Sequence, residues 1–144
     1  MRTATSILVI AFCFIASAQK SLVYATNDGA IRGYDPVAYF KQEEPVKGTE
    51  SFTYEWQGAE WRFSSQENLE AFKAEPEQYA PQFGGYCAYA IGNGYTYKSD
   101  PKAWKIVDGK LYLNYSKGIQ KKWEANQAEF IKKAEKNWPR VVKE

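Results

Sequence analysis

Two segments of the chain alternate apolar and polar residues on either side of a tight-turn dipeptide, and this pattern restricts the fold more than any other feature. In residues 51–64 the dipeptide is Gln57-Gly58, and in residues 104–115 it is Asp108-Gly109, a strong signal for a type I′ turn. Alternation with a period of two predicts strands, so each segment should form a β-hairpin with one buried face. The apolar faces are predicted to hold Phe52, Tyr54, Trp56, Ala59, Trp61 and Phe63 in the first hairpin, and Trp104, Ile106, Leu111, Leu113 and Tyr115 in the second.

Helical signals lie between and after the hairpins. Asp35-Pro36 is typical of a helix start, and residues 64–67 (Ser-Ser-Gln-Glu) match a capping box that opens a second helix. After Ser116, apolar residues recur at the helical period as far as Trp138, which predicts one long C-terminal helix. The sequence therefore predicts a small single α+β domain, in which two β-hairpins form an antiparallel sheet beside short helices and a long C-terminal helix.

The N-terminus has the features of a secretory signal peptide. Arg2 is followed by an apolar run over residues 7–16, and Ala16-Ser17-Ala18 matches a small-residue cleavage site. The run is shorter than the roughly 20 residues that a membrane-spanning helix needs, and an uncleaved anchor is the alternative. We expect a signal peptide over residues 1–18, a mature domain over residues 19–144, and a periplasmic or extracellular location without membrane contact after cleavage.

The composition excludes several classes of chemistry. The chain has no histidine, which rules out an imidazole base, a histidine-ligated metal and a Ser-His-Asp triad within it. Its 19 basic and 17 acidic residues are interspersed and give a net charge of +2, so nucleic acid is not an expected partner. Aromatic residues make up 17% of the chain, which is enough to build a sizeable core without a disulfide.

Cys87 is the only cysteine of the predicted mature chain and its only soft nucleophile. It follows Gly84-Gly85 and precedes a short helix-compatible segment, so free backbone amides are expected to stabilise a thiolate and lower the thiol pKa. Cys87 is therefore the candidate catalytic residue, and Gly84, Gly85, Tyr86 and Tyr89 are the candidate ligand-binding residues. The alternative is a buried, unreactive cysteine packed between the two tyrosines.

Three aspartates stand at positions where a structural role is expected. Asp35 and Asp100 each precede a proline and suit caps or turns, while Asp108 belongs to the predicted type I′ turn. The tyrosine-rich stretch over residues 79–97 fits either an aromatic pocket or ordinary core packing.

Several motifs in order along the chain resemble those of the YHS domain. They are GYDPVAYF (33–40), GAEWRFSS (58–65), GGYCA (84–88), DPKAW (100–104), DGKLYLN (108–114) and NWP (137–139). The chain resembles the exported bacterial group called YHS domain-containing (seleno)proteins. This resemblance implies that a cysteine position of the group can hold selenocysteine, and Cys87 is the only mature candidate. A redox-active, low-pKa nucleophile is then the expected role of that position.

The resemblance also has departures, which concern metal binding. Metal-binding YHS modules carry cysteines where this chain has Ala38, Ser64 and Asn68. The Tyr-His-Ser signature itself reads Trp61, Arg62 and Ser65. The metal site of those modules therefore does not carry over to this chain, and no metal-binding residues and no cofactor are expected.

Two classes of function remain open. The first is an exported ligand-binding or accessory module for a small molecule, with a pocket near Cys87 as its functional thiol. The second is a thiol-based redox protein, in which an external thiol partner must resolve Cys87 because the mature chain has no second cysteine. That absence and the missing imidazole base favour the binding module. Weak metal binding by Cys87 with Asp or Tyr oxygens is a third alternative, since one soft ligand gives little selectivity.

Overall fold

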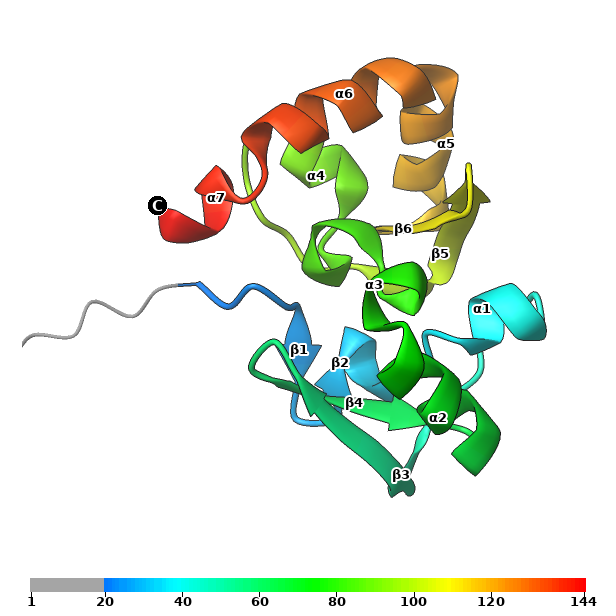
Figure 1. Cartoon of the computed structure of the whole chain (residues 1–144). Coiled ribbons are helices and arrows are strands. Elements are labelled where there is room, and N and C mark those ends of the chain that lie inside the picture. Colours follow the sequence, from blue (N-terminus) through cyan, green and yellow to red (C-terminus); the bar gives the residue numbers. More distant parts are fainter. Residues whose placement is uncertain (1–19) are drawn as a thin grey trace, which may run out of the picture.

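Three β-hairpins form the strands of the protein, and the computed structural model describes them within residues 20–144. The predicted signal peptide over residues 1–18 lies outside the described residues. The pairs are β1 (Ala25–Thr26) with β2 (Gly29–Ala30), β3 (Thr49–Trp56) with β4 (Ala59–Phe63), and β5 (Asp100–Val107) with β6 (Lys110–Asn114). All three pairs are antiparallel, and helices cover them, so the predicted α+β class is confirmed (Figure 1).

The turns of the two predicted hairpins form as the sequence indicates. Gln57 and Gly58 have φ of 49° and 75°, and Asp108 and Gly109 have φ of 51° and 74°. Two consecutive left-handed residues are what a type I′ turn requires, and its twist matches that of the flanking strands. The register next to the turns follows: Tyr54 pairs with Trp61, and Ile106 pairs with Leu111.

The structure corrects the predicted sheet in two respects. First, the two hairpins lie in separate two-stranded sheets and do not join into one. β6 is buried on both faces, and its hairpin lies between two hydrophobic cores. Second, the ladder shifts between Thr49 and Thr53, so Phe63 pairs with Thr49 and not with Phe52. Such a bulge bends a strand and moves its outer residues out of alternation.

Short helices connect the hairpins. They are η1 (Ile31–Gly33), α1 (Ala38–Lys41), α2 (Gln66–Ala74), α3 (Pro76–Tyr79), η2 (Gln82–Gly85) and α4 (Ala88–Gly92). The predicted helix after the first hairpin begins one residue later than expected. Ser65 is its N-cap, because its hydroxyl accepts a hydrogen bond from the Asn68 amide at 3.1 Å. Ser64 therefore remains available for a different contact.

The predicted long C-terminal helix is broken in the structure. It consists of α5 (Lys117–Ala125), α6 (Gln127–Asn137) and α7 (Arg140–Lys143), with Asn126 in a non-helical conformation between the first two. The break lets each helix pack on a different element. Trp123 of α5 lies 5.3 Å from Tyr112 of β6 between ring centroids, while Phe130 of α6 lies 4.7 Å from Tyr89 of α4.

Two hydrophobic cores result, one on each side of the β5–β6 hairpin. The first contains Val23, Ile31, Val37, Tyr39, Trp61, Phe63, Phe72, Leu111 and Leu113. The second contains Phe83, Ala88, Ile91, Tyr112, Trp123, Ala134 and Val141. Figure 1 shows β1–β4 with α2 around the first core and α4–α7 around the second. No helix within residues 20–144 is both long enough and apolar enough to cross a membrane.

Candidate functional site

Cys87 is the N-cap residue of α4, and its side chain is almost completely buried, at 2% exposure. The sulfur accepts a hydrogen bond from the Tyr115 amide at 3.2 Å, and the thiol faces Asn114 Oδ1 at 3.7 Å. The same Asn114 oxygen accepts the Tyr89 amide at 3.1 Å. Cys87 and Asn114 therefore join the start of α4 to the end of β6, and the sequence offered no signal for this role of Asn114.

The prediction that the pKa of the Cys87 thiol is lowered is wrong. Backbone amides do approach the sulfur, as predicted, and they act to lower the thiol pKa. Burial acts in the opposite direction and outweighs them, so the pKa of the Cys87 thiol lies above its ordinary value. A thiolate that is almost completely buried loses more solvation than a few amide dipoles return.

A small pocket of about 110 Å³ lies over Cys87. Four tyrosines line it together with smaller residues: Tyr89, Tyr95, Tyr97 and Tyr115. Three of these rings are unusually exposed for aromatic side chains, at 50%, 45% and 41% for Tyr95, Tyr97 and Tyr115. The volume has room for a few water-sized molecules, so a small reagent can enter it.

We expect iodoacetamide to label Cys87 in the folded protein much more slowly than it labels an exposed thiol, with a pH midpoint above about 8.5. The reason is the burial that raises the thiol pKa. The matched control is the double variant Cys87→Ser/Tyr95→Cys, in which the predicted mature chain carries one thiol, at an exposed position. Equal labelling rates at neutral pH in the two proteins would contradict this expectation.

The free energy of unfolding should fall as the pH rises above the ordinary thiol pKa. The folded state holds the thiol proton more tightly than the unfolded chain does. Cys87 therefore stabilises the fold fully below the ordinary thiol pKa of about 8.5, and this contribution is lost as the pH rises through the higher folded-state pKa.

The other predicted ligand-binding residues do not converge on Cys87. Tyr89 lines the Cys87 pocket, but Tyr86 points elsewhere and donates its hydroxyl to the Ser21 carbonyl at 2.7 Å. Gly84 and Gly85 are left-handed, with φ of 64° and 80°, and serve close packing. A Cβ on Gly84 would collide with the Leu22 backbone, and one on Gly85 would meet the Ile31 side chain at 2.5 Å.

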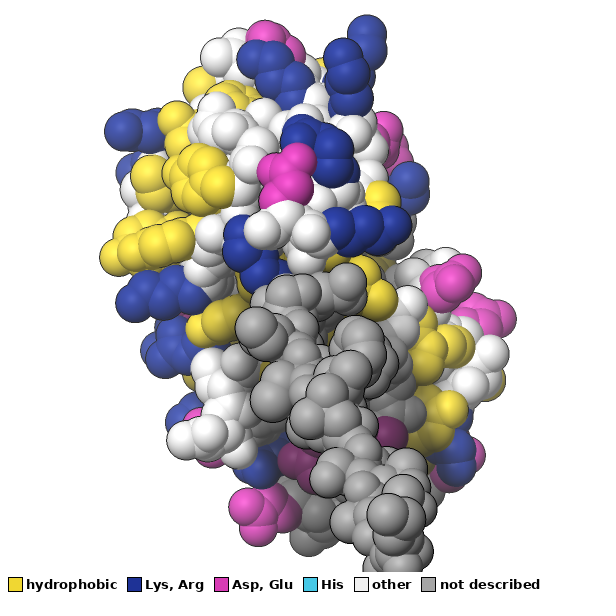
Figure 2. All heavy atoms as spheres, turned by 90° about the vertical axis from the view of Figure 1, so that its left-hand side faces the viewer, with side chains coloured by type: hydrophobic (Ala, Val, Ile, Leu, Met, Phe, Trp, Pro, Cys, Tyr) yellow, Lys and Arg dark blue, Asp and Glu magenta, His cyan; other side chains and the backbone are white. Residues whose placement is uncertain are grey.

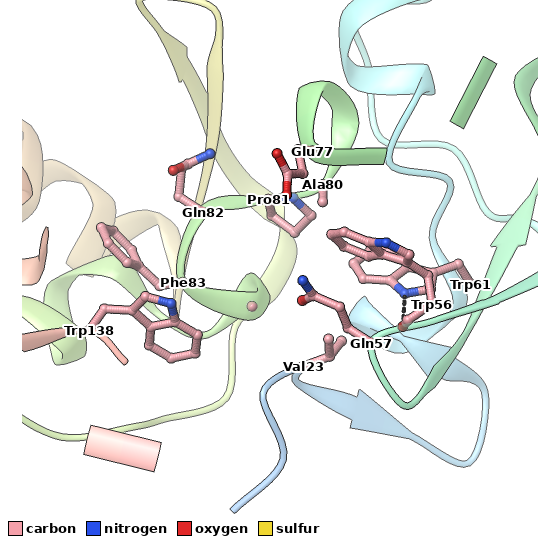
Figure 3. A pocket seen from close by; sticks show the side chains of 11 residues that line it. Val23, Trp56, Gln57, Trp61, Glu77, Ala80, Pro81, Gln82, Phe83 and Trp138 are labelled. Carbon is pink, nitrogen blue, oxygen red and sulfur yellow. Dashed lines mark hydrogen bonds between the residues drawn. The ribbon is translucent and has the colours of Figure 1, made fainter. Parts of the chain in front are cut away.

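A larger pocket of about 390 Å³ lies where the two cores meet, and we call it the junction pocket. Figure 3 shows Trp56 and Trp61 on one side, Phe83 and Trp138 on the other, and Gln57 between them. The remaining lining residues are Val23, Glu77, Ala80, Pro81, Gln82 and Gly84. Of the four ligand-binding residues predicted from the sequence, only Gly84 lines this pocket, because its walls come from segments that are far apart in the chain.

A buried polar cluster surrounds Asp35, whose side chain has no exposed surface. One carboxylate oxygen accepts the amides of Val37 and Ala38 at 2.9 and 3.3 Å. The other accepts the Ser64 amide and hydroxyl at 2.9 and 2.7 Å and the Asn68 side-chain amide at 2.7 Å. Asp35 thus joins the start of α1 to the start of α2, which fits its predicted structural role.

A comparison with protein-family models finds the YHS domain over residues 37–83. The chain contains a YHS domain. No similar curated protein and no similar solved structure was found.

The YHS domain covers α1, the β3–β4 hairpin, α2 and α3, and the match ends at Phe83. Cys87 and, apart from Phe83, the buried residues of the second core lie outside it. The three positions where metal-binding YHS modules carry cysteines meet at the Asp35 cluster, because Ala38, Ser64 and Asn68 all donate hydrogen bonds to that carboxylate. Within residues 20–144 no group of three or more His, Cys, Asp or Glu side chains is placed to hold a metal ion.

Proposed function

We propose that this YHS domain-containing protein is an exported ligand-binding module, and that the junction pocket holds its ligand. The observation that carries the proposal is a pocket of about 390 Å³ with aromatic walls between the two cores. Ligand pockets usually have volumes of about 300–1,000 Å³, lie between structural units and combine apolar walls with a few polar groups. Gln57, Gln82 and Glu77 are the polar groups here.

The lining also suggests a class of ligand. Glu77 is the only charged residue among the lining side chains, so the pocket disfavours an anion. Indole faces attract cations and stack on flat or apolar surfaces, and amide side chains form hydrogen bonds with hydroxyl groups. We therefore propose a small neutral or cationic molecule with polar substituents as the ligand.

The thiol-based redox alternative has less support. The burial of Cys87, its raised pKa and the absence of a second cysteine in the predicted mature chain all oppose fast thiol exchange. In the binding module, the thiol acts through its contacts with Tyr115 and Asn114, which fix the start of α4.

Titration with choline as the cationic probe and glucose as the neutral probe tests the proposal. Either probe should change the tryptophan fluorescence in a saturable way, because Trp56 and Trp138 line the pocket. Glu77→Gln should weaken choline binding by about tenfold and leave glucose binding nearly unchanged. The matched control is Glu44→Gln, which removes an exposed carboxylate from the loop after α1. If neither probe gives a saturable change at millimolar concentrations, the proposed function is wrong.

Export is the second part of the proposal, and the A-x-A motif that ends at Ala18 supports it. We expect the mature protein to begin at Gln19. N-terminal sequencing of protein recovered from the cell exterior or periplasm measures this directly. Recovery of a chain that retains the apolar run over residues 7–16 would contradict the expectation.

A further inference from the structure

A second, basic pocket lies away from the junction pocket and carries the opposite charge. It measures about 500 Å³ and is lined by Tyr24, Arg32, Lys98, Ser99, Asp100, Tyr115 and Ser116. Two cationic side chains and one carboxylate give the lining a net positive charge. These residues come from the N-terminal hairpin region, the start of β5 with the segment before it, and the loop between β6 and α5, so only the fold brings them together.

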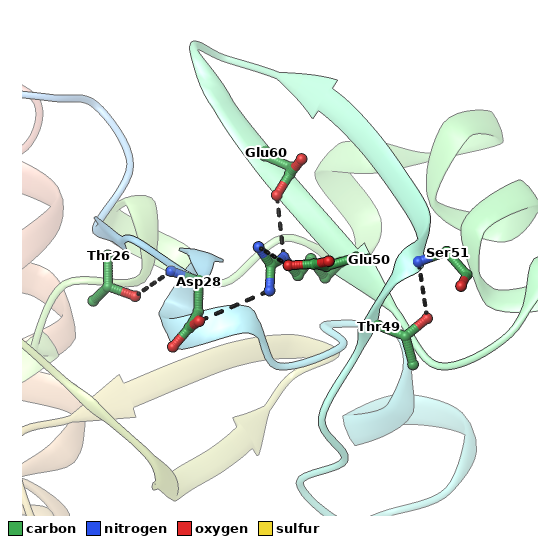
Figure 4. Close-up of polar contacts among 7 residues, drawn as sticks. Thr26, Asp28, Thr49, Glu50, Ser51 and Glu60 are labelled. Carbon is green, nitrogen blue, oxygen red and sulfur yellow. Dashed lines mark hydrogen bonds and ion pairs between the residues drawn. The ribbon is translucent and has the colours of Figure 1, made fainter.

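The guanidinium of Arg32 has no carboxylate within 4 Å among residues 20–144, and Arg62 provides the contrast. Around Arg62 lie Glu60 at 3.1 Å, Glu50 at 3.6 Å and Asp28 at 3.8 Å (Figure 4). Arg62 is therefore neutralised within the protein, whereas Arg32 retains its donors for another group. A guanidinium presents a planar set of donors that matches a carboxylate or a phosphate.

The backbone at Arg32 has an unusual conformation beside this pocket, and the side chain that it carries is exposed. Arg32 and the preceding Ile31 have φ of 58° and 44°, a left-handed conformation that is strained for side chains of this size. Complete burial of Ile31 and a hydrogen bond from its amide to the Tyr24 carbonyl at 2.9 Å hold this conformation. The Arg32 charge acts on the neighbouring Tyr24 hydroxyl, because it lowers a pKa that burial otherwise raises.

The opposite wall supplies a second cation and more polar groups. The Lys98 ammonium lies 5.9 Å from the centre of the Tyr115 ring. Ser116 caps α5, and its hydroxyl accepts the Ile119 amide at 3.1 Å, which places the start of this nine-residue helix at the pocket. The first turn of α5 contains no acidic residue, so no side chain there competes with an incoming anion.

The lining of the basic pocket holds two cations and a single carboxylate. On the face shown in Figure 2, basic and acidic side chains are interspersed, with hydrophobic patches between them. In the basic pocket, Asp100 is the only acidic lining residue, and one of its oxygens already accepts the Lys102 amide at 2.9 Å.

We propose that this pocket binds a small anionic group, a carboxylate or a phosphate, between Arg32 and Lys98. Tyr24 and Tyr115 flank the group and offer aromatic surface to the remainder of the ligand. The site is separate from the junction pocket, and the proposal does not depend on the function assigned to that pocket.

Titration of the protein with inorganic phosphate and with benzoate, followed by amide NMR shifts, tests this site. We expect a saturable shift of the Ser99 and Gly118 amides with at least one probe. Arg32→Gln should weaken that binding by about 10- to 100-fold, and Arg32→Lys should recover part of the loss because it restores charge without the planar donors. Asp100→Asn should strengthen binding severalfold, since it removes the opposing charge but retains the oxygen that accepts the Lys102 amide.

Lys110→Gln is the matched control, because Lys110 is exposed in the second hairpin and outside the pocket lining. It changes the net charge by the same amount and should leave binding within about twofold. Tighter binding of phosphate assigns the site to phosphate groups, and tighter binding of benzoate assigns it to carboxylates. Absence of a saturable shift with both probes, or an equal loss in Lys110→Gln and Arg32→Gln, would overturn the proposal.

Discussion

Replacing Trp61 by alanine is expected to lower the free energy of unfolding by about 3–5 kcal/mol. Trp61 is only 1% exposed, and its ring lies 5.2 Å from that of Phe72 and 5.8 Å from that of Trp56 between centroids. Its indole nitrogen also donates to the Trp56 carbonyl at 3.0 Å. Alanine would leave a cavity at the centre of the first core and remove this hydrogen bond.

Denaturation in urea, followed by circular dichroism, measures the effect. The control is Tyr95→Ala, which truncates an aromatic side chain that is 50% exposed and should change the free energy of unfolding by about 0.5 kcal/mol or less. A midpoint for Trp61→Ala close to that of the control would mean that the first hairpin does not bury this face.

The Asp35→Ala variant is expected to lose about 3–4 kcal/mol of the free energy of unfolding. Asp35 is fully buried and accepts five hydrogen bonds from α1, Ser64 and Asn68. Without the carboxylate, the amide of Val37 and the side chain of Asn68 lose acceptors in a place that water does not reach. An unsatisfied buried donor costs more than its hydrogen bond contributed.

Two further variants distinguish the contribution of the Asp35 carboxylate from that of its hydrogen-bond partners. Ser64→Ala removes a single donor of the cluster and should cost about 1 kcal/mol. Asp35→Asn keeps the shape but places an amide donor against other donors, so its stability should lie between those of Asp35→Ala and the unchanged protein. If Asp35→Ala were no less stable than Ser64→Ala, the cluster would not hold α1 to α2.

Local features of the fold were predictable from the sequence. The type I′ turns at Gln57-Gly58 and Asp108-Gly109, the register next to each turn and the cap at Ser116 depend on residues within a few positions of one another. The resemblance to the YHS domain could also be recognised from the sequence, because each of its motifs is a continuous run of residues. These features follow from backbone geometry and short-range hydrogen bonds, which a sequence pattern records directly.

The candidate site was less predictable, and Cys87 shows why. The sequence correctly placed backbone amides near its sulfur, but it could not show that the side chain would be only 2% exposed in the fold. The sign of the pKa change depended on that burial. The sequence also predicted Gly84 and Gly85 as ligand-binding residues. Both are needed for contact with Leu22 and Ile31, and Gly84 also lines the junction pocket and not the Cys87 pocket.

The sequence by itself determined two of the three hairpins with their turns, the start of α5 at Ser116 and the absence of histidine chemistry. Only the tertiary structure decided that β6 is buried on both faces, that the C-terminal helix breaks at Asn126, and that separate pockets of opposite charge exist around Glu77 and Arg32. The physical reason is that burial of apolar surface has no direction along the chain. The sequence pattern shows that an apolar face will be covered. Which distant segment covers that face depends on how all the elements pack together.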